Sequence, residues 1–179
     1  MADQVEKDVE EDIASETFKL TWRHKALICS AAVTLCGPFL KAHEGDFLQS
    51  YQDIGHHWAA CEGVDGAIPN HLYTRAQCDA MDKEALQQKI AGVSMEITVP
   101  VTPELLAAHT SFAYNIGLGA YHKSKTLKLT NAGYLAHGCA SMLDFYRAGG
   151  HDCRIRANNC YGVWQRRQDE VKLCMEGVK

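Results

Sequence analysis

Residues 105–116 form a run in which nearly every side chain is apolar or small. Thr102 and Pro103 precede this run in the order expected of a helix start, a capping hydroxyl followed by proline at the first helical position. Gly117 and Gly119 follow it, and glycine is the usual residue just beyond a helix end. A helix that is apolar on all sides must be surrounded by protein. The sequence therefore predicts a central buried helix around which the other elements are arranged.

The segments on either side of this helix predict an α+β fold. Residues 49–64 are rich in aromatic side chains and are interrupted by two glycines, which favours extended strands joined by turns. A helix is predicted to begin after Thr74 as its N-cap, and two more are predicted over residues 130–147 and 163–175. The length of 179 residues fits one domain. We expect a small β-hairpin lobe and a larger helical lobe, with a site in the cleft between them.

The charge of the chain is negative and unevenly distributed. The formal net charge is −4, and no segment is obviously basic, which argues against a nucleic-acid-binding protein. Residues 1–16 contain seven acidic residues and a single lysine, and the rest of the chain is close to neutral. We interpret residues 1–22 as a solvated acidic arm.

The chain contains eight cysteines and no C-x-x-C pair. Two of them, Cys29 and Cys36, lie in an apolar run, and the other six are dispersed through the rest of the chain. Dispersed cysteines favour disulfides in an oxidising compartment over a zinc site, and several buried free thiols are the alternative. Six cysteines allow fifteen pairings. Cys153 and Cys160, which flank a polar loop, are the most plausible local pair.

Residues 26–40 (ALICSAAVTLCGPFL) contain no charged side chain and directly follow a basic tripeptide. The run is shorter than the about twenty residues that a stable membrane span needs. Its length and flanking charge match the apolar region of a signal peptide. Cleavage after Ala42 would leave a new N-terminus just before Glu44, so we favour an uncleaved, weakly held anchor over residues 23–42. The alternative is the buried first helix of a soluble domain.

Glu44 and Asp53 are two carboxylates nine positions apart, the first after the apolar run and the second in an aromatic-rich segment. Glycosidases use such a pair: one carboxylic acid protonates the leaving oxygen, and the other carboxylate directs water or itself onto the sugar. Carboxylates are common on protein surfaces, so the spacing gains weight only from the sequence that follows. We take both as candidate catalytic residues.

Five blocks of sequence occur in a fixed order between residues 26 and 179. They are Gly37-Pro38 with Glu44-Gly45, Tyr51-x-Asp53 with Trp58-Ala59-Ala60-Cys61-Glu62-Gly63, Ser111-Phe112-Ala113-Tyr114-Asn115-Ile116-Gly117, Tyr121-His122-Lys123-Ser124, and Ala148-Gly149-Gly150 with Tyr161-Gly162-Val163-Trp164-Gln165-Arg166-Arg167 and Glu170. In this order they resemble the phage-type lysozymes, and most of all the lambdoid-phage endolysins that begin with a signal-anchor-release segment.

The resemblance implies a lysozyme-like catalytic domain over residues 43–179 that hydrolyses the β-1,4 bond between N-acetylmuramic acid and N-acetylglucosamine in peptidoglycan. It implies that Glu44 is the general acid, which has to stay protonated near neutral pH in a partly apolar surrounding. Asp53 is then the ionised partner that activates water or stabilises the developing charge on the sugar. The family's third residue, a Thr that helps to hold this water, is Ala59 here, and the His of the family's G-H-T turn is Val64.

The resemblance also implies substrate contacts, partners and a location. Tyr114 and Ser124 fall at cleft-lining and sugar-contacting positions, although Tyr114 also suits the core. Arg166 and Arg167 are expected to brace the last helix. No cofactor is implied, and the partners are peptidoglycan and, through residues 26–40, the inner membrane. We expect a monomer that is anchored in the host inner membrane and later released into the periplasm.

Two other functions remain open. A degenerate lysozyme-like protein could bind peptidoglycan or a partner without cutting, since Ala59 and Val64 depart from the family. An anchorless helical interaction protein could bind a basic partner through its acidic arm.

Two further interpretations concern His and Cys side chains. His56, His57 and Cys61 lie close together, but alternation along a strand sends His56 and His57 to opposite faces, so we expect no zinc site. If the segment over residues 26–40 leaves the bilayer, Cys29 or Cys36 could exchange with a disulfide of the catalytic lobe and activate it.

Overall fold

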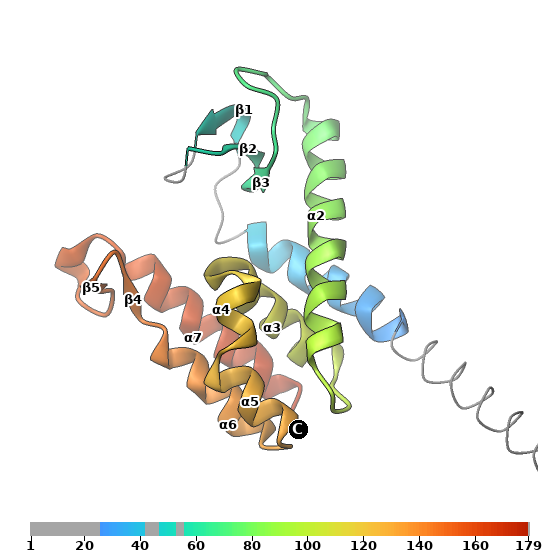
Figure 1. The fold of residues 1–179 in the computed structure, drawn as a ribbon, viewed down its shortest axis with the longest axis vertical. Coiled ribbons are helices and arrows are strands. Elements are labelled where there is room, and N and C mark those ends of the chain that lie inside the picture. Colours follow the sequence, from blue (N-terminus) through green and yellow to red (C-terminus); the bar gives the residue numbers. More distant parts are fainter. Residues whose placement is uncertain (1–25, 42–46, 53–55, 179) are drawn as a thin grey trace, which may run out of the picture.

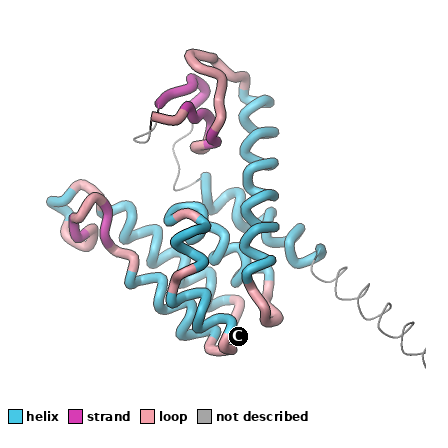
Figure 2. The backbone as a smooth tube through the Cα atoms, viewed as in Figure 1, coloured by secondary structure: helices cyan, strands magenta, loops and turns pink. Residues whose placement is uncertain are grey.

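A computed structural model describes residues 26–41, 47–52 and 56–178. A small β lobe and a larger helical lobe are joined by one long helix (Figure 1, Figure 2). After a helix over residues 26–41, the elements are β1 (Phe47–Gln52), β2 (Trp58–Cys61), β3 (Val64–Asp65), α2 (Arg75–Glu96), α3 (Pro103–Ile116), α4 (Leu118–His122), α5 (Lys125–Asn131), α6 (Leu135–Ala140), η1 (Ser141–Asp144), β4 (Arg147–Ala148), β5 (His151–Asp152), η2 (Arg156–Asn158) and α7 (Tyr161–Glu176). The predicted α+β fold is confirmed.

The β lobe is an antiparallel sheet in the order β1-β2-β3. Tyr51 pairs with Ala59 and Ala59 pairs with Asp65, so these three residues form one row across the sheet. The lobe has a small core of its own, made of Ala60, Cys61, Ala67, Tyr73 and Cys78. A disulfide between Cys61 and Cys78 links β2 to α2. The sheet is therefore held to the long helix covalently as well as by packing.

The long helix α2 runs from the β lobe into the helical lobe (Figure 1). Thr74 is its N-cap, as predicted: the side chain accepts a hydrogen bond from the backbone N–H of Gln77, whose side chain accepts from the backbone N–H of Thr74. Farther along, Leu86, Ile90 and Val93 are buried. The first half of α2 thus supports the sheet, and the second half packs in the helical lobe.

The predicted central helix is α3. Nine consecutive residues, from Leu105 to Ala113, are buried. Thr102 caps the helix by accepting a hydrogen bond from the N–H of Leu105, and Gly117, with φ of 82°, ends it. The all-round apolar character of this segment therefore predicted its position correctly.

The helix over residues 26–41 packs against the helical lobe. Ala32, Cys36 and Leu40 are spaced four residues apart, are buried, and belong to the main core. The thiol of Cys36 donates to the carbonyl oxygen of Ala107 at 3.6 Å. Across the part of the chain that the structure describes, no helix combines the length and the apolar character that crossing a membrane requires. In this conformation the segment is one wall of the lobe.

A single helix over residues 130–147 is wrong. α5 ends at Asn131, and Gly133 then adopts φ of 83°, a left-handed conformation that suits glycine and stops the helix. α6 and η1 follow as short separate pieces before the chain enters β4. By contrast, the helix predicted over residues 163–175 is confirmed as α7.

Three disulfides are present: Cys61–Cys78, Cys139–Cys174 and Cys153–Cys160. The local pair predicted from sequence is thus confirmed. Cys29 and Cys36 are free. The prediction of disulfides among the six dispersed cysteines is therefore confirmed, and the alternative of buried free thiols is wrong for those six.

Candidate active site

Glu44 and Asp53, the predicted catalytic pair, lie outside the residues that the structure describes. They flank β1, which the structure does describe, and β1 lies at the edge of the sheet next to β2. The candidate surface that the structure does describe consists of the sheet, the first half of α2 and the C-terminal end of α3, which meet at Tyr114.

Tyr114, near the end of α3, connects the helical lobe to the β lobe. Its hydroxyl donates a hydrogen bond to the carbonyl oxygen of Glu62 at 2.8 Å. The next residue, Gly63, adopts φ of 83°, and a Cβ built there would lie 3.9 Å from the Tyr51 hydroxyl and 4.0 Å from the Tyr114 hydroxyl. The tight turn between β2 and β3 thus brings the backbone close to two tyrosines, which makes Tyr114 a junction residue and not simply a core residue.

Two hollows border Tyr114, one on each side of α2. The first, about 240 Å³, is lined by the end of the first helix, by Glu62, and by the α2 residues Asp79, Asp82, Lys83 and Leu86. The second, about 380 Å³, is lined by the β2–β3 turn, Asp65, Gln88, Lys89 and Leu118. Both combine apolar and polar side chains with one aromatic ring, as sites for polar ligands do.

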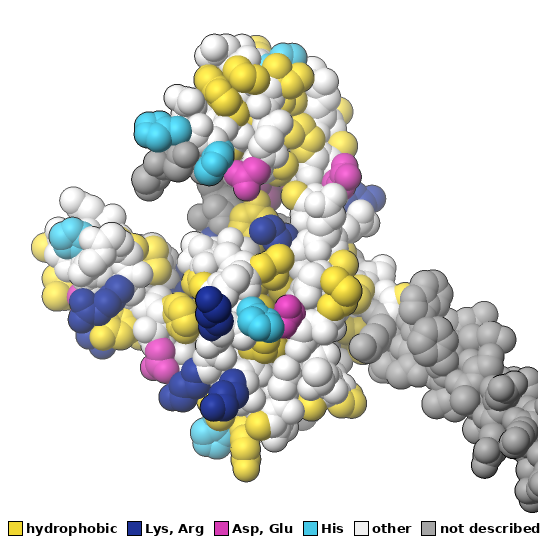
Figure 3. Space-filling view, viewed as in Figure 1, with side chains coloured by type: hydrophobic (Ala, Val, Ile, Leu, Met, Phe, Trp, Pro, Cys, Tyr) yellow, Lys and Arg dark blue, Asp and Glu magenta, His cyan; other side chains and the backbone are white. Residues whose placement is uncertain are grey.

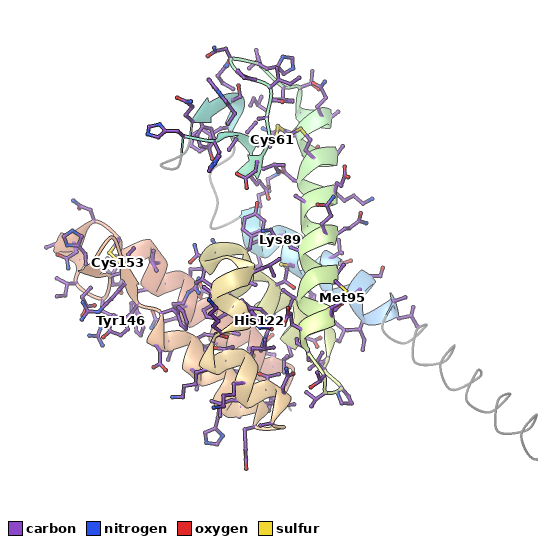
Figure 4. The ribbon with its side chains drawn as sticks, viewed as in Figure 1. Cys61, Lys89, Met95, His122, Tyr146 and Cys153 are labelled. Carbon is purple, nitrogen blue, oxygen red and sulfur yellow. A yellow bond between two sulfur atoms is a disulfide. The ribbon has the colours of Figure 1, made fainter. Side chains whose placement is uncertain are left out.

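Lys89 and Asp65 in the second hollow were not singled out from the sequence. The Lys89 ammonium lies 5.7 Å from the centre of the Tyr114 ring, a cation–π distance, and Figure 4 places Lys89 on α2 at the junction of the lobes. Asp65 pairs directly with Ala59 across the sheet. This pairing and its place in the lining of the second hollow connect Asp65 to the candidate site, and a correct strand register would have supplied the pairing.

The two departures from the family pattern lie within the β lobe. Ala59 is 2% exposed and carries no hydroxyl, so this position cannot orient water through a side chain. Val64 lines the second hollow together with Ala85 of α2. The hollow is therefore lined by an apolar side chain at the position where the resemblance implies an imidazole.

Ser124 is buried and is the N-cap of α5. Its hydroxyl accepts a hydrogen bond from the N–H of Leu127 at 3.1 Å. It lines neither of the two hollows at Tyr114. The geometry gives this side chain a structural role, and its predicted contact with sugar remains a prediction.

The group His56, His57 and Cys61, weighed above as a zinc site, has no free cysteine. Cys61 is bonded to Cys78, so it cannot be a metal ligand. In residues 26–41, 47–52 and 56–178, no three His, Cys, Asp or Glu side chains are grouped so that they could hold a metal ion.

Arg166, Arg167 and Glu170 form a buried network between α7 and α3, which agrees with the predicted bracing role of the arginines. The Ser111 hydroxyl donates to Glu170 Oε1 at 2.7 Å, and Arg166 Nε donates to the same oxygen at 3.1 Å. Arg167 Nε lies 3.1 Å from Glu170 Oε2. Burial raises the pKa of Glu170, opposed by the two guanidinium groups, and lowers the pKa of Arg167 to about 10.

Cys36, one of the two free thiols, lies on the side of the first helix that is buried against the core. Burial raises the pKa of this thiol to about 12, so it is protonated near neutral pH. Thiol exchange requires the thiolate. In the packed conformation Cys36 is therefore unreactive, and any exchange by this residue belongs to a conformation in which the first helix has left the core.

Comparison with known proteins gives one consistent result. The family model for phage lysozyme matches residues 41–170. A probable prophage lysozyme of Escherichia coli (strain K12) is 35% identical over 156 residues, which cover 84% of this chain and 88% of the relative. A SAR-endolysin of Escherichia phage 933W is 34% identical over 155 residues, covering 83% of this chain and 88% of that protein.

Solved structures agree in fold. The muramidase domain of SpmX from Asticaccaulis excentricus superposes with a TM-score of 0.68 at 23% identity, covering 80% of this chain and 94% of that chain. A mutant of P22 lysozyme superposes with a TM-score of 0.64 at 25% identity, again over 80% of this chain and 94% of the other. The two-lobe arrangement is thus that of lysozyme-like structures.

Proposed function

Because this chain belongs to the phage lysozyme family, we propose that it is a peptidoglycan-degrading endolysin. It hydrolyses the β-1,4 bond between N-acetylmuramic acid and N-acetylglucosamine and so lyses the host cell. The observation that carries the proposal is the family match over residues 41–170, which spans the β lobe, the long helix and the helical lobe. The hollows beside Tyr114, where the lobes meet, give a sugar polymer a place to bind.

In this proposal Glu44 and Asp53 divide the chemistry. Glu44 donates a proton to the leaving oxygen, and Asp53 activates water or stabilises the positive charge that develops on the sugar. Tyr114 contributes an aromatic face to substrate binding, with its orientation fixed by the hydrogen bond to Glu62. Cofactor chemistry has no part in this division.

The experiment that tests the function compares clearance of peptidoglycan suspensions by the wild-type chain and by Glu44→Gln. We expect clearance by the wild type and at least a hundredfold slower clearance by the variant, because the amide cannot donate the proton. Glu176→Gln, at the exposed end of α7, is the matched control and should clear at the wild-type rate. Equal clearance by Glu44→Gln and the wild type would exclude Glu44 as the general acid.

Ala59→Thr should accelerate clearance on the order of tenfold or more, because it supplies a hydroxyl at the family's water-holding position. Ala59→Val is the matched control, since valine has nearly the shape of threonine and no hydroxyl. The clearance rate should rise for threonine and stay level or fall for valine. Equal rates for the two variants would show that the hydroxyl has no role here.

A second function, wall binding without cleavage, is favoured by Ala59 and Val64, the two departures from the family pattern. It predicts that neither the wild type nor Glu44→Gln clears peptidoglycan and that both sediment with it. Sedimentation of both proteins with purified wall material, measured beside clearance, separates the two functions.

We further propose that the chain is divided into an acidic arm (residues 1–22), an anchor segment (23–42) and a monomeric catalytic domain (43–179). Residues 26–40 hold the protein in the host inner membrane before it is released into the periplasm, where the wall lies. The names of the SAR-endolysin relatives support this location. Membrane fractionation tests it, and a chain found only in the soluble fraction, without wall activity, would instead favour the interaction-protein alternative.

A further inference from the structure

A basic loop projects from the helical lobe at the end of the molecule that carries β4 and β5 (Figure 1). We call residues 146–161 the arginine loop; it contains β4, β5 and η2, and the Cys153–Cys160 disulfide closes its second half. Figure 4 places Tyr146 and Cys153 here, away from Lys89 at the lobe junction. No residue of the arginine loop lines the two hollows at Tyr114. The two described hollows therefore do not account for this loop.

Each of the three arginines in the loop lies over a tyrosine ring. The guanidinium carbon of Arg154 is 3.9 Å from the centre of the Tyr146 ring, and that of Arg147 is 5.3 Å from the same ring. Arg156 lies 3.9 Å from the centre of the Tyr161 ring. Stacking fixes the plane of a guanidinium while its edge N–H groups stay available to oxygen acceptors. The three cations are therefore held in defined positions, Arg154 and Arg156 within the disulfide-closed segment and Arg147 in the β4–β5 hairpin.

The loop has more cations than carboxylates. Arg154 is paired with Asp152, with Nη2 lying 2.6 Å from Oδ2. Arg147 and Arg156 are exposed, and neither has a carboxylate within ion-pair distance in the described parts of the chain. Lys and Arg side chains gather at this end on the face shown in Figure 3. Both guanidinium groups thus lie outside ion-pair distance of a carboxylate, with Arg147 opposite Asp152 across β4 and β5 and affected by its charge at longer range.

Ile155, which lies between Arg154 and Arg156, is 53% exposed. A large apolar side chain flanked by two cations is unfavourable toward water but suits a bilayer surface. There the cations meet lipid phosphates while the apolar group enters the boundary between headgroups and acyl chains. Tyr146 and Tyr161, beneath the arginines, are also residues that favour this boundary. An anionic polymer in water would satisfy the arginines but would leave Ile155 exposed.

We propose that the arginine loop is a docking surface for an anionic phospholipid bilayer, with Arg147 and Arg156 contacting headgroup phosphates and Ile155 inserting at the interface. The surface is separate from the helix over residues 26–41. It holds the helical lobe at a membrane while the hollows at Tyr114 stay uncovered.

The test is flotation of the purified full chain with vesicles of phosphatidylcholine containing 30% phosphatidylglycerol, compared with vesicles of phosphatidylcholine alone. The variant Arg147→Gln/Arg156→Gln should bind the anionic vesicles on the order of tenfold more weakly than the wild type. Ile155→Ser, which leaves the charge unchanged, should weaken binding severalfold. Arg75→Gln/Lys172→Gln is the matched control, because it removes two exposed cations from α2 and α7.

The control should bind like the wild type, and raising the salt to about 0.5 M should weaken wild-type binding through screening. Equal losses in the control and the arginine variant would overturn the proposal, since net charge alone would then explain binding. Equal wild-type binding to both kinds of vesicle would also overturn it, by assigning attachment to residues 26–40. If the arginine variant lost binding to purified peptidoglycan and kept binding to the anionic vesicles, the loop would be a wall-binding surface and the proposal would be overturned. Unchanged clearance by the arginine variant would show that docking and the proposed hydrolysis are separate.

Discussion

Glu170→Gln should lower the free energy of unfolding by about 3–5 kcal/mol, the range measured when one partner of a buried ion pair is removed. The Glu170 side chain is fully buried, and it lies between the side chains of Arg166 and Arg167, which are 5% and 0% exposed. The pKa of Arg167 is lowered to about 10, so its guanidinium remains charged at pH 7. The amide would leave two buried guanidinium groups without a counter-charge, and the Ser111 hydroxyl without its carboxylate acceptor.

Urea unfolding at pH 7, followed by circular dichroism, measures this loss. Glu176→Gln, on the same helix but exposed, should stay within about 0.5 kcal/mol of the wild type. A loss below about 1 kcal/mol in Glu170→Gln would mean that the network adds little to stability and that the arginines are satisfied in another way.

Acidification should destabilise the protein through His109, at the centre of α3. This side chain is fully buried, with Nδ1 lying 2.8 Å from the Tyr121 hydroxyl, and burial lowers its pKa from 6.5 to about 3. A histidine whose pKa is lower in the folded state binds fewer protons there than in the unfolded chain. Its stabilising contribution is complete above pH 6.5 and is lost as the pH falls toward 3.

Each pH unit within this window costs about 1.4 kcal/mol, so this group accounts for roughly 3 kcal/mol between pH 7 and pH 4. Measuring the free energy of unfolding across that range for the wild type and His109→Gln isolates the contribution. The wild type should lose more stability than the variant on acidification. His137→Gln replaces an exposed histidine and should keep the wild-type pH dependence. Parallel pH profiles for the wild type and His109→Gln would show that His109 does not set the acid sensitivity.

The sequence predicted those elements of the fold whose type and position can be read from a single stretch of the chain. The central helix follows from its apolar residues and its two caps, and the start of α2 follows from Thr74. The break after α5 was missed because one glycine inside a helical pattern does not by itself mark a helix end, and only the positive φ of Gly133 shows that the backbone turns there. Of the three disulfides, the local Cys153–Cys160 pair could be inferred, whereas Cys139–Cys174 joins residues whose proximity depends on packing between helices.

The candidate site divides in the same way. The motifs pointed to Tyr114, but its hydrogen bond to Glu62 joins residues 52 positions apart and could not be deduced from spacing. Ser124 was assigned to sugar binding from its motif. In the structure its hydroxyl caps α5 by accepting a hydrogen bond from the N–H of Leu127. Lys89 and Asp65 belong to no motif, and the strand register and the position of α2 are needed to place them beside Tyr114.

The central helix α3 receives its neighbours from distant parts of the chain. Cys36 contacts Ala107 across 71 positions, and the hydroxyl of Thr102 donates to the carbonyl oxygen of Gly177 across 75. Bringing such distant residues together costs chain entropy before the contacts stabilise the structure. Formation of these contacts is therefore slower than formation of the helix itself. We therefore expect α3 to be enclosed late in folding, when segments from both ends of the described chain have reached it. We expect a nascent chain in which α7 is not yet available to leave the apolar surface of α3 exposed on the side that α7 later covers.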